Sequence, residues 1–184
     1  MTKEEIGKPL FDILKEQGRP TEAMDLISRA YDFAYKAHDG QLRKSEDPYI
    51  IHPVEVACIL AELNADTETI CSCLLHDVLE DTSMTAEDLA AHGIPERVVT
   101  AVRALTRRDD QTPEKYYAAV AADALARRVK HADLADNSDP RRLAVLEADD
   151  PATAARLRAK YAHAAAELAR LSGDKADAAG SAGR

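Results

Sequence analysis

The chain has 184 residues, of which 46% are hydrophobic and 31% are charged, a balance typical of one globular domain. With 24 Lys and Arg against 33 Asp and Glu, the formal net charge is -9, which argues against a general nucleic-acid binder because cations for a phosphate backbone are scarce. The sequence contains no apolar run of about 18 residues, so we expect no membrane span or signal peptide and a cytoplasmic location.

The apolar residues of the first third of the chain recur at helical spacing rather than at period two. After Thr21 this spacing predicts a helix over residues 22–38. The charged segment 39–51 contains glycine and proline and is expected to be a loop. His52-Pro53 then opens a second helix, because proline is favoured at the first helical position.

Caps and prolines mark the later helices. Thr67 is expected to cap a helix that continues to about Leu79, and Thr85 to Asp88 resembles a capping box. Further helices are predicted to start at Pro95, at Thr112-Pro113, at Ala121 and at Asp150-Pro151, with Pro140 ending the one that begins at Ala121.

The pattern as a whole predicts an all-α fold, a compact bundle of roughly seven to nine helices. We expect residues 21–171 to form this domain, after an N-terminal extension over 1–20 and before a disordered tail over 172–184. The three cysteines lie in apolar segments and are expected to be reduced core residues.

Polar residues interrupt the apolar segment that starts near Cys71. His76 and Asp77 follow two leucines, and an ionised carboxylate in such a setting is costly unless it is paired or bound to a cation. Residues three or four apart share a helix face, so Glu80 and Asp81 would point in similar directions if the helix continues. This cluster suggests a cation site.

Two more polar residues lie beside apolar segments far away in the chain, His52 and Asp133. Two neutral imidazoles with two carboxylates would balance the charge of a divalent ion, and such mixed ligands suit Mn, Fe, Co, Ni or Zn better than Ca. Spacing alone leaves open whether these residues converge on a metal or are satisfied polar groups in the core.

The run His52-Pro53, His76-Asp77 and Asp133 resembles the H…HD…D signature of the HD superfamily of metal phosphohydrolases. The segment from Ala37 to Ser45, followed by Pro48-Tyr49-Ile50, is similar to the hydrolase domain of RelA/SpoT-type proteins and their small single-domain relatives. Leu74 to Thr82 and Val129 to Asn137 are similar to the same domain, so the resemblance covers roughly residues 22 to 143.

Members of that branch remove the 3′-pyrophosphate from ppGpp and pppGpp with Mn²⁺ and an activated water. The resemblance implies one divalent metal, Mn²⁺, held by His52, His76, Asp77 and Asp133. It implies that the acids that position or deprotonate the water are Glu80 and Asp81. It also implies a small phosphorylated nucleotide as substrate, contacted by Arg43, Lys44, Ser45 and Asn137.

The chain departs from the family at two positions near the expected nucleotide. Glu46 stands where the family usually has glycine, and Asp139 where it has a basic residue. Other readings therefore stay open: an HD phosphohydrolase for a nucleotide monophosphate or NADPH, or a nucleotide-binding regulatory module without turnover. The oligomeric state is open too, and His38 is either structural or close to the site.

Overall fold

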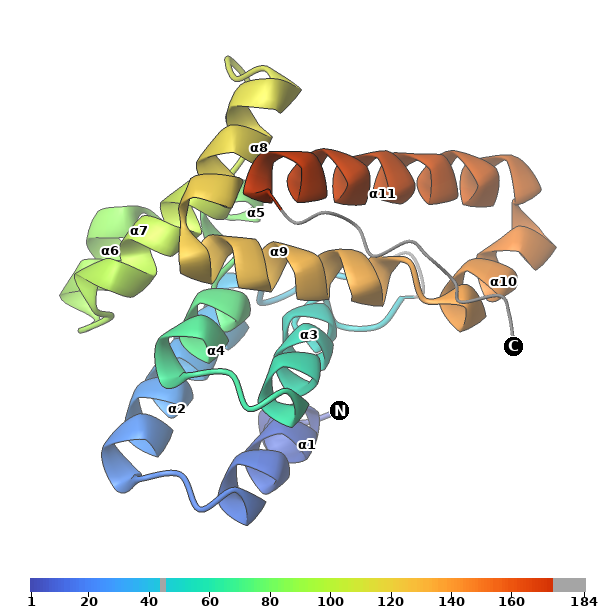
Figure 1. Ribbon diagram of the computed structural model, residues 1–184. Helices are drawn as coiled ribbons and strands as arrows, with labels where there is room; N and C mark the ends of the chain where they lie inside the picture. Colours follow the sequence, from blue (N-terminus) through green and yellow to red (C-terminus); the bar gives the residue numbers. More distant parts are fainter. Residues whose placement is uncertain (44–45, 174–184) are drawn as a thin grey trace, which may run out of the picture.

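The computed structural model describes residues 1–43 and 46–173, and within these ranges it consists of eleven helices without a strand (Figure 1). The all-α prediction is confirmed. The helices are α1 (Lys3–Glu16), α2 (Thr21–Ala37), α3 (Ile51–Glu62), α4 (Thr67–Leu74), α5 (Val78–Asp81), α6 (Ala86–Ala91), α7 (Glu96–Leu105), α8 (Pro113–Ala122), α9 (Ala124–Asn137), α10 (Pro140–Asp149) and α11 (Pro151–Ser172). No helix among the described residues is long and apolar enough to cross a membrane.

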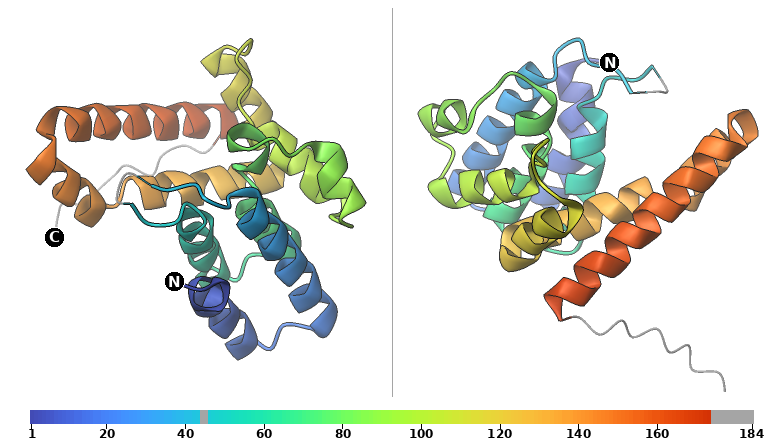
Figure 2. Two further views of the ribbon diagram at one scale, coloured as in Figure 1. Left: turned by 180° about the vertical axis from the view of Figure 1, so that it is seen from behind. Right: turned by 90° about the horizontal axis from the view of Figure 1, so that it is seen from above.

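Helices α4 and α9 lie at the centre of the molecule. Helix α4 contacts α2, α3, α7 and α9, and α9 also contacts α3, α7, α8 and α11. Figure 1 shows α9 crossing the ends of α3 and α4, with α11 running alongside it, and Figure 2 shows the same arrangement from behind and from above. Every residue of α4 from Thr69 to Leu74 is buried, so this helix lies inside the bundle.

Helix α1 packs against α3 and contributes Leu10 and Leu14, both fully buried, to the shared core. Gly7 allows a close approach to α2, because a Cβ atom there would lie 2.8 Å from Cε1 of Tyr31. The Tyr31 hydroxyl donates to the Lys3 carbonyl at 2.6 Å. Helix α1, which lies within the predicted N-terminal extension over residues 1–20, is therefore packed into the bundle.

The helix predicted from Thr67 to about Leu79 is interrupted. Helix α4 ends at Leu74, and a turn over residues 75–77 precedes the short α5. Helices α1 and α10, which are not predicted from the sequence, also raise the number of helices above the expected seven to nine. Pro140 follows the end of α9 but also begins α10, because Asp139 caps that helix by accepting the Arg141 backbone N–H at 2.8 Å.

The other predicted helix starts agree with the structure to within a few residues. Thr85 and Asp88 form a capping box at α6, and Thr112 caps α8. At α4 the cap is Asp66 rather than Thr67. Helix α11 ends at Ser172 with Gly173 at φ 71°, and the rest of the predicted tail, residues 174–184, lies outside the described residues.

Asp123 fixes the start of α9. Its carboxylate accepts the backbone N–H groups of Leu125 and Ala126, each at 2.9 Å, and pairs with Arg97 at 2.6 Å. We expect Asp123→Ala to lower the free energy of unfolding by about 1–2 kcal/mol. Asp123→Asn should lose less because it keeps the cap and loses only the charge. Urea denaturation measures both, and an equal loss in the two variants would contradict the capping role.

Candidate metal centre

Three separate segments place the predicted metal ligands in one region. His52 lies in the first turn of α3, His76 and Asp77 lie in the turn between α4 and α5, and Asp133 lies on α9. His52, His76 and Asp133 are buried and Asp77 is half-buried. The mutual packing of α3, α4 and α9 therefore brings together residues that are up to 81 positions apart (133 − 52).

The four side chains converge. His52, His76 and Asp77 each offer one ligand atom, and these atoms lie within 4.8 Å of one another. Asp77 Oδ2 is 3.2 Å from His76 Nε2 and 3.8 Å from His52 Nε2. Asp133 Oδ1 is 3.2 Å from His52 Nε2 and 3.9 Å from His76 Nε2. Both imidazoles thus turn the same nitrogen toward the two carboxylates.

The hydrogen bonds of the imidazoles show why a cation fits between these atoms. His76 Nδ1 lies 2.6 Å from the Cys73 carbonyl, which can only accept, so this nitrogen carries the proton. In the neutral ring Nε2 then has a lone pair, and this buried atom has no hydrogen-bond partner within the described ranges. A lone pair that faces carboxylate oxygens is unfavourable by itself and favourable around a divalent ion.

The carboxylates shift the pKa values of neighbouring groups in the direction expected for a site that binds a cation. Burial lowers the pKa of His52, but hydrogen bonds to Asp133 and Asp136 and the nearby charges raise it overall to about 9. Burial raises the pKa of Asp133, but His52 and the Lys130 ammonium outweigh this and lower it. The raised pKa of His52 shows that the surrounding carboxylates favour positive charge at this place.

Each predicted ligand is held by a further group. The Tyr49 hydroxyl donates to Asp77 Oδ2 at 2.6 Å, and Lys130 Nζ donates to Asp133 Oδ2 at 2.7 Å. His52 Nδ1 lies 3.0 Å from Asp136 Oδ2. Tyr49, Lys130 and Asp136 are not among the site residues predicted from the sequence. The spacing of three residues from Lys130 to Asp133 could have revealed the second of these.

Glu80 and Asp81, the expected catalytic acids, are exposed residues of α5. The continuous helix on which their shared face with His76 and Asp77 depended is not present, because His76 and Asp77 lie in the turn over 75–77 that precedes α5. Asp77 takes the position before α5, where its carbonyl accepts the Asp81 backbone N–H at 2.8 Å. Glu80 Oε2 accepts the backbone N–H of Arg107 at 2.8 Å. The Asp81 carbonyl accepts from Gln41 Nε2 at 2.7 Å.

His38 is buried near these acids. Its Nδ1 lies 2.8 Å from Gln41 Oε1, and its ring packs on Tyr49 with centroids 4.9 Å apart. Burial lowers the pKa of His38, and the carboxylates of Asp77 and Asp81 act in the opposite direction. Of the two readings left open for His38, the structure favours a place close to the site.

The structure describes two of the four residues that are expected to contact the substrate, Arg43 and Asn137. Arg43 Nη1 pairs with Glu55 at 2.8 Å, and Asn137 Nδ2 donates to Asp133 Oδ1 at 2.5 Å. Lys44 and Ser45 lie outside the described residues. Glu46, the departure from the family's glycine, adopts φ 65°, the left-handed conformation that glycine reaches without steric cost.

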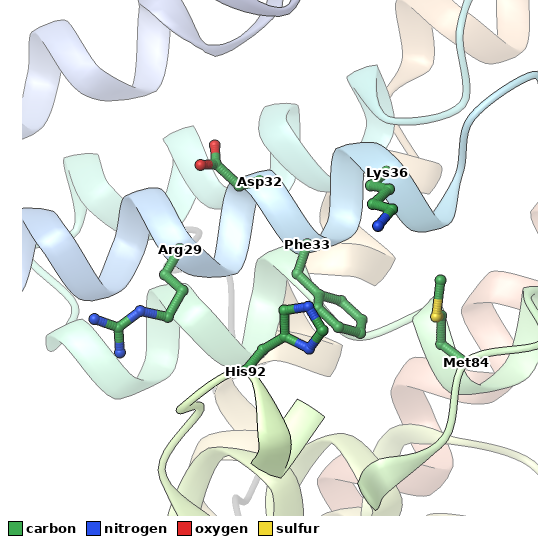
Figure 3. Close-up of a pocket in the computed structure, with 6 residues that line it drawn as sticks. All are labelled: Arg29, Asp32, Phe33, Lys36, Met84 and His92. Atoms are coloured by element: carbon green, nitrogen blue, oxygen red, sulfur yellow. The ribbon is translucent and has the colours of Figure 1, made fainter. Parts of the chain in front are cut away.

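A separate pocket of about 280 Å³ lies elsewhere, between α2 and the segment around α6 (Figure 3). Phe33 packs against the edge of the His92 ring there, with centroids 4.7 Å apart. None of the predicted site residues lines this pocket; the lining residues are Arg29, Asp32, Phe33, Lys36, Met84 and His92. The candidate centre is therefore located by its ligand atoms rather than by a cavity.

The comparisons with known proteins agree with this geometry. The HD domain family matches residues 30–174. The guanosine-3′,5′-bis(diphosphate) 3′-pyrophosphohydrolase of Vibrio cholerae is 51% identical over 86 residues, which are 45% of this chain and 12% of that protein. The bifunctional (p)ppGpp synthase/hydrolase SpoT of Escherichia coli is 51% identical over 70 residues, 38% of this chain and 10% of that protein. The chain thus spans about a tenth of the length of these relatives.

A solved structure shows the same fold. It is described as "A metazoan ortholog of SpoT hydrolyzes ppGpp and plays a role in starvation responses", and it aligns with a TM-score of 0.56 and 24% identity over 83% of this chain and 94% of that one. An HD domain implies a divalent metal, which the two imidazoles and two carboxylates fit. Since the family match covers well over half of the sequence, the chain belongs to the HD domain family.

Proposed function

We propose that this HD domain removes the 3′-pyrophosphate from (p)ppGpp, with one Mn²⁺ held by His52, His76, Asp77 and Asp133. The proposal rests on the convergence of two imidazole Nε2 atoms and two carboxylates in one largely buried site. The names of the Vibrio and Escherichia relatives indicate the substrate class. A cytoplasmic location is part of the same proposal.

In this reaction water attacks the phosphorus next to the 3′ oxygen and the bond between these two atoms breaks. The 3′ oxygen leaves and takes up a proton, and the water oxygen becomes part of the released pyrophosphate. A bound divalent metal supplies positive charge to the phosphoryl oxygens and makes water more acidic. The Glu80 carboxylate takes the proton of the attacking water, and the Arg107 backbone N–H that it accepts at 2.8 Å holds it in place. Asp81, the next residue, helps to orient the water.

Two side chains hold the carboxylates of the site in place before a substrate arrives. Lys130 is half-buried, and its pKa rises despite desolvation because Asp133 and Tyr116 lie beside it. It holds one oxygen of Asp133 at 2.7 Å while the other oxygen faces the two imidazoles. The Tyr49 hydroxyl donates to Asp77 Oδ2, the oxygen that faces the two imidazoles, and holds that carboxylate in place. Neither carboxylate therefore has to reorganise during the reaction.

A specific observation favours a second candidate, an HD phosphohydrolase for a nucleotide monophosphate or NADPH. Two of the residues expected to contact the guanosine nucleotide are already engaged, Arg43 with Glu55 and Asn137 with Asp133. A guanidinium has five N–H donors, so Arg43 can bind a phosphate and keep Glu55. A substrate with fewer phosphates would need fewer contacts from Arg43 and Asn137.

The candidates are separated by incubating the Mn²⁺-loaded chain with ppGpp, ppApp, NADPH and guanosine monophosphate. We expect pyrophosphate from ppGpp. Orthophosphate from the monophosphate, or turnover of NADPH alone, would support the second candidate. Tight binding of ppGpp without turnover would instead support a regulatory module and contradict both hydrolase proposals.

The role of Glu80 predicts a specific kinetic result. Glu80→Gln should lower kcat by about 10²- to 10⁴-fold because the amide cannot accept the water proton. Mn²⁺ binding should be unchanged, since Glu80 lies outside the converging ligand atoms. Glu87→Gln is the matched control, because Glu87 is exposed and pairs with Arg103 at 3.1 Å. Full activity in Glu80→Gln would rule out Glu80 as the base.

A further inference from the structure

Asp136 and Arg142 form a contact behind His52, on the side away from the converging ligand atoms. Asp136 is buried on α9, and its Oδ2 lies 3.0 Å from His52 Nδ1, while His52 Nε2 faces Asp133. Arg142, in the first turn of α10, pairs with the same Oδ2 of Asp136 and reaches the Asp136 carbonyl at 3.4 Å. The chain His52–Asp136–Arg142 thus links α3, α9 and α10.

We propose that Asp136 and Arg142 are positioning residues that hold His52 with its Nε2 toward the metal. This inference rests on the proposed metal site. An ionised carboxylate can only accept, so Asp136 keeps the proton of the neutral ring on Nδ1 and leaves the lone pair on Nε2. A carboxylate behind a ligating imidazole also fixes the ring orientation and makes the imidazole a stronger ligand.

Arg142 has a separate task in this arrangement. Asp136 lies three residues after Asp133 and therefore on a neighbouring part of the same helix face. Without a cation beside it, Asp136 would add a third negative charge to a site that already holds Asp77 and Asp133. The Arg142 guanidinium offsets that charge and holds Asp136 behind the imidazole.

The local sequence explains why Arg142 reaches this place. Asp139 caps α10 and Pro140 takes its first position, so the helix begins immediately after α9. Arg142 then falls in the first turn, next to the end of α9. The departure from the family at Asp139 is thereby given a structural role, since it starts the helix that carries Arg142.

The test measures metal affinity and the state of the His52 ring. Free Mn²⁺ is followed by electron paramagnetic resonance during titration of the full chain and of Asp136→Ala, Asp136→Asn and Arg142→Ala. Long-range ¹H–¹⁵N spectra, with Zn²⁺ as a diamagnetic probe, report which ring nitrogen of His52 carries the proton. Arg141→Ala is the matched control, because Arg141 neighbours Arg142 but pairs with Asp139.

We expect Asp136→Ala to bind Mn²⁺ about 10- to 100-fold more weakly and His52 to lose its single tautomer. Asp136→Asn should fall between it and the unmodified chain, because the amide oxygen still accepts from Nδ1. Arg142→Ala should weaken binding while Arg141→Ala leaves it unchanged. Should Asp136→Ala fail to fold, Asp136→Asn and Arg142→Ala give the same comparison.

Unchanged affinity and an unchanged His52 tautomer in Asp136→Asn and Arg142→Ala would overturn the inference while leaving the metal site intact. An unmodified chain that binds no Mn²⁺ would overturn both the positioning role of Asp136 and Arg142 and the proposed metal-dependent function. An unmodified chain that binds Mn²⁺ with the predicted order of variants, but does not release pyrophosphate from ppGpp, would support the positioning role and contradict the proposed function alone.

Discussion

Replacing Asp77 with alanine should abolish hydrolysis and weaken Mn²⁺ binding by more than about 100-fold. Loss of a residue that only supports a ligand costs about 10- to 100-fold in affinity, so loss of a ligand should cost more. Asp77 Oδ2 is 3.2 Å from His76 Nε2, and the turn after α4 offers no second carboxylate at that place. Mn²⁺ titration and pyrophosphate release from ppGpp measure the two effects on one sample.

Asp25→Ala is the control for this experiment, because Asp25 is exposed on α2 and lies outside the converging ligand atoms. Circular dichroism shows whether both variants keep their helices. An Asp77→Ala protein that is folded and binds Mn²⁺ as tightly as the unmodified chain would exclude Asp77 as a ligand.

Replacing Leu14 with alanine should lower the free energy of unfolding by about 2–5 kcal/mol. Leu14 is fully buried, and the loss combines the transfer energy of the removed atoms with the cavity that they leave. The size of the effect tests whether α1 belongs to the cooperative fold, as its packing against α3 indicates. Urea unfolding followed by circular dichroism gives the value.

Leu63→Ala provides the comparison, since Leu63 is 73% exposed and is the C-cap residue that follows α3. We expect a change of less than about 0.5 kcal/mol for this surface substitution. If Leu14→Ala were as mild as Leu63→Ala, α1 would be an appendage whose unfolding does not disturb the rest of the bundle.

Much of the fold can be predicted from the sequence because capping residues mark the starts of its helices. Thr85 with Asp88, and the side chains of Thr112 and Asp150, accept backbone N–H groups at three predicted helix starts. Pro113 and Pro151, which have no N–H, take the first turn of their helices. Such caps are local and can be read without knowing the packing. Pro140 is harder to interpret, because a proline that cannot continue one helix can also take the first position of the next.

The break after α4 could not be predicted from periodicity. Leu74, Leu75 and Val78 are all fully buried, so the apolar pattern looks the same for a continuous helix and for a turn. In the structure His76 Nδ1 bonds the Cys73 carbonyl, and the turn directs His76 and Asp77 toward α3 and α9. The broken helix is thus a condition for the convergence of the ligands.

The groups that support the ligands were the least predictable part of the site. Tyr49 and Asp77 are 28 residues apart, and His52 and Asp136 are 84 apart. These pairs become neighbours only through the packing of α3, α4 and α9, and no local sequence pattern predicts that packing. The H…HD…D run identified the converging side chains because a resemblance supplies long-range information that spacing lacks.

We propose that His52, His76, Asp77 and Asp133 share one divalent ion, which can be located by anomalous scattering from crystals grown with Mn²⁺. We expect one strong anomalous peak between His52 Nε2, His76 Nε2 and the oxygens of Asp77 and Asp133. A peak bound by other residues, or none at a Mn²⁺ concentration that supports catalysis, would contradict it.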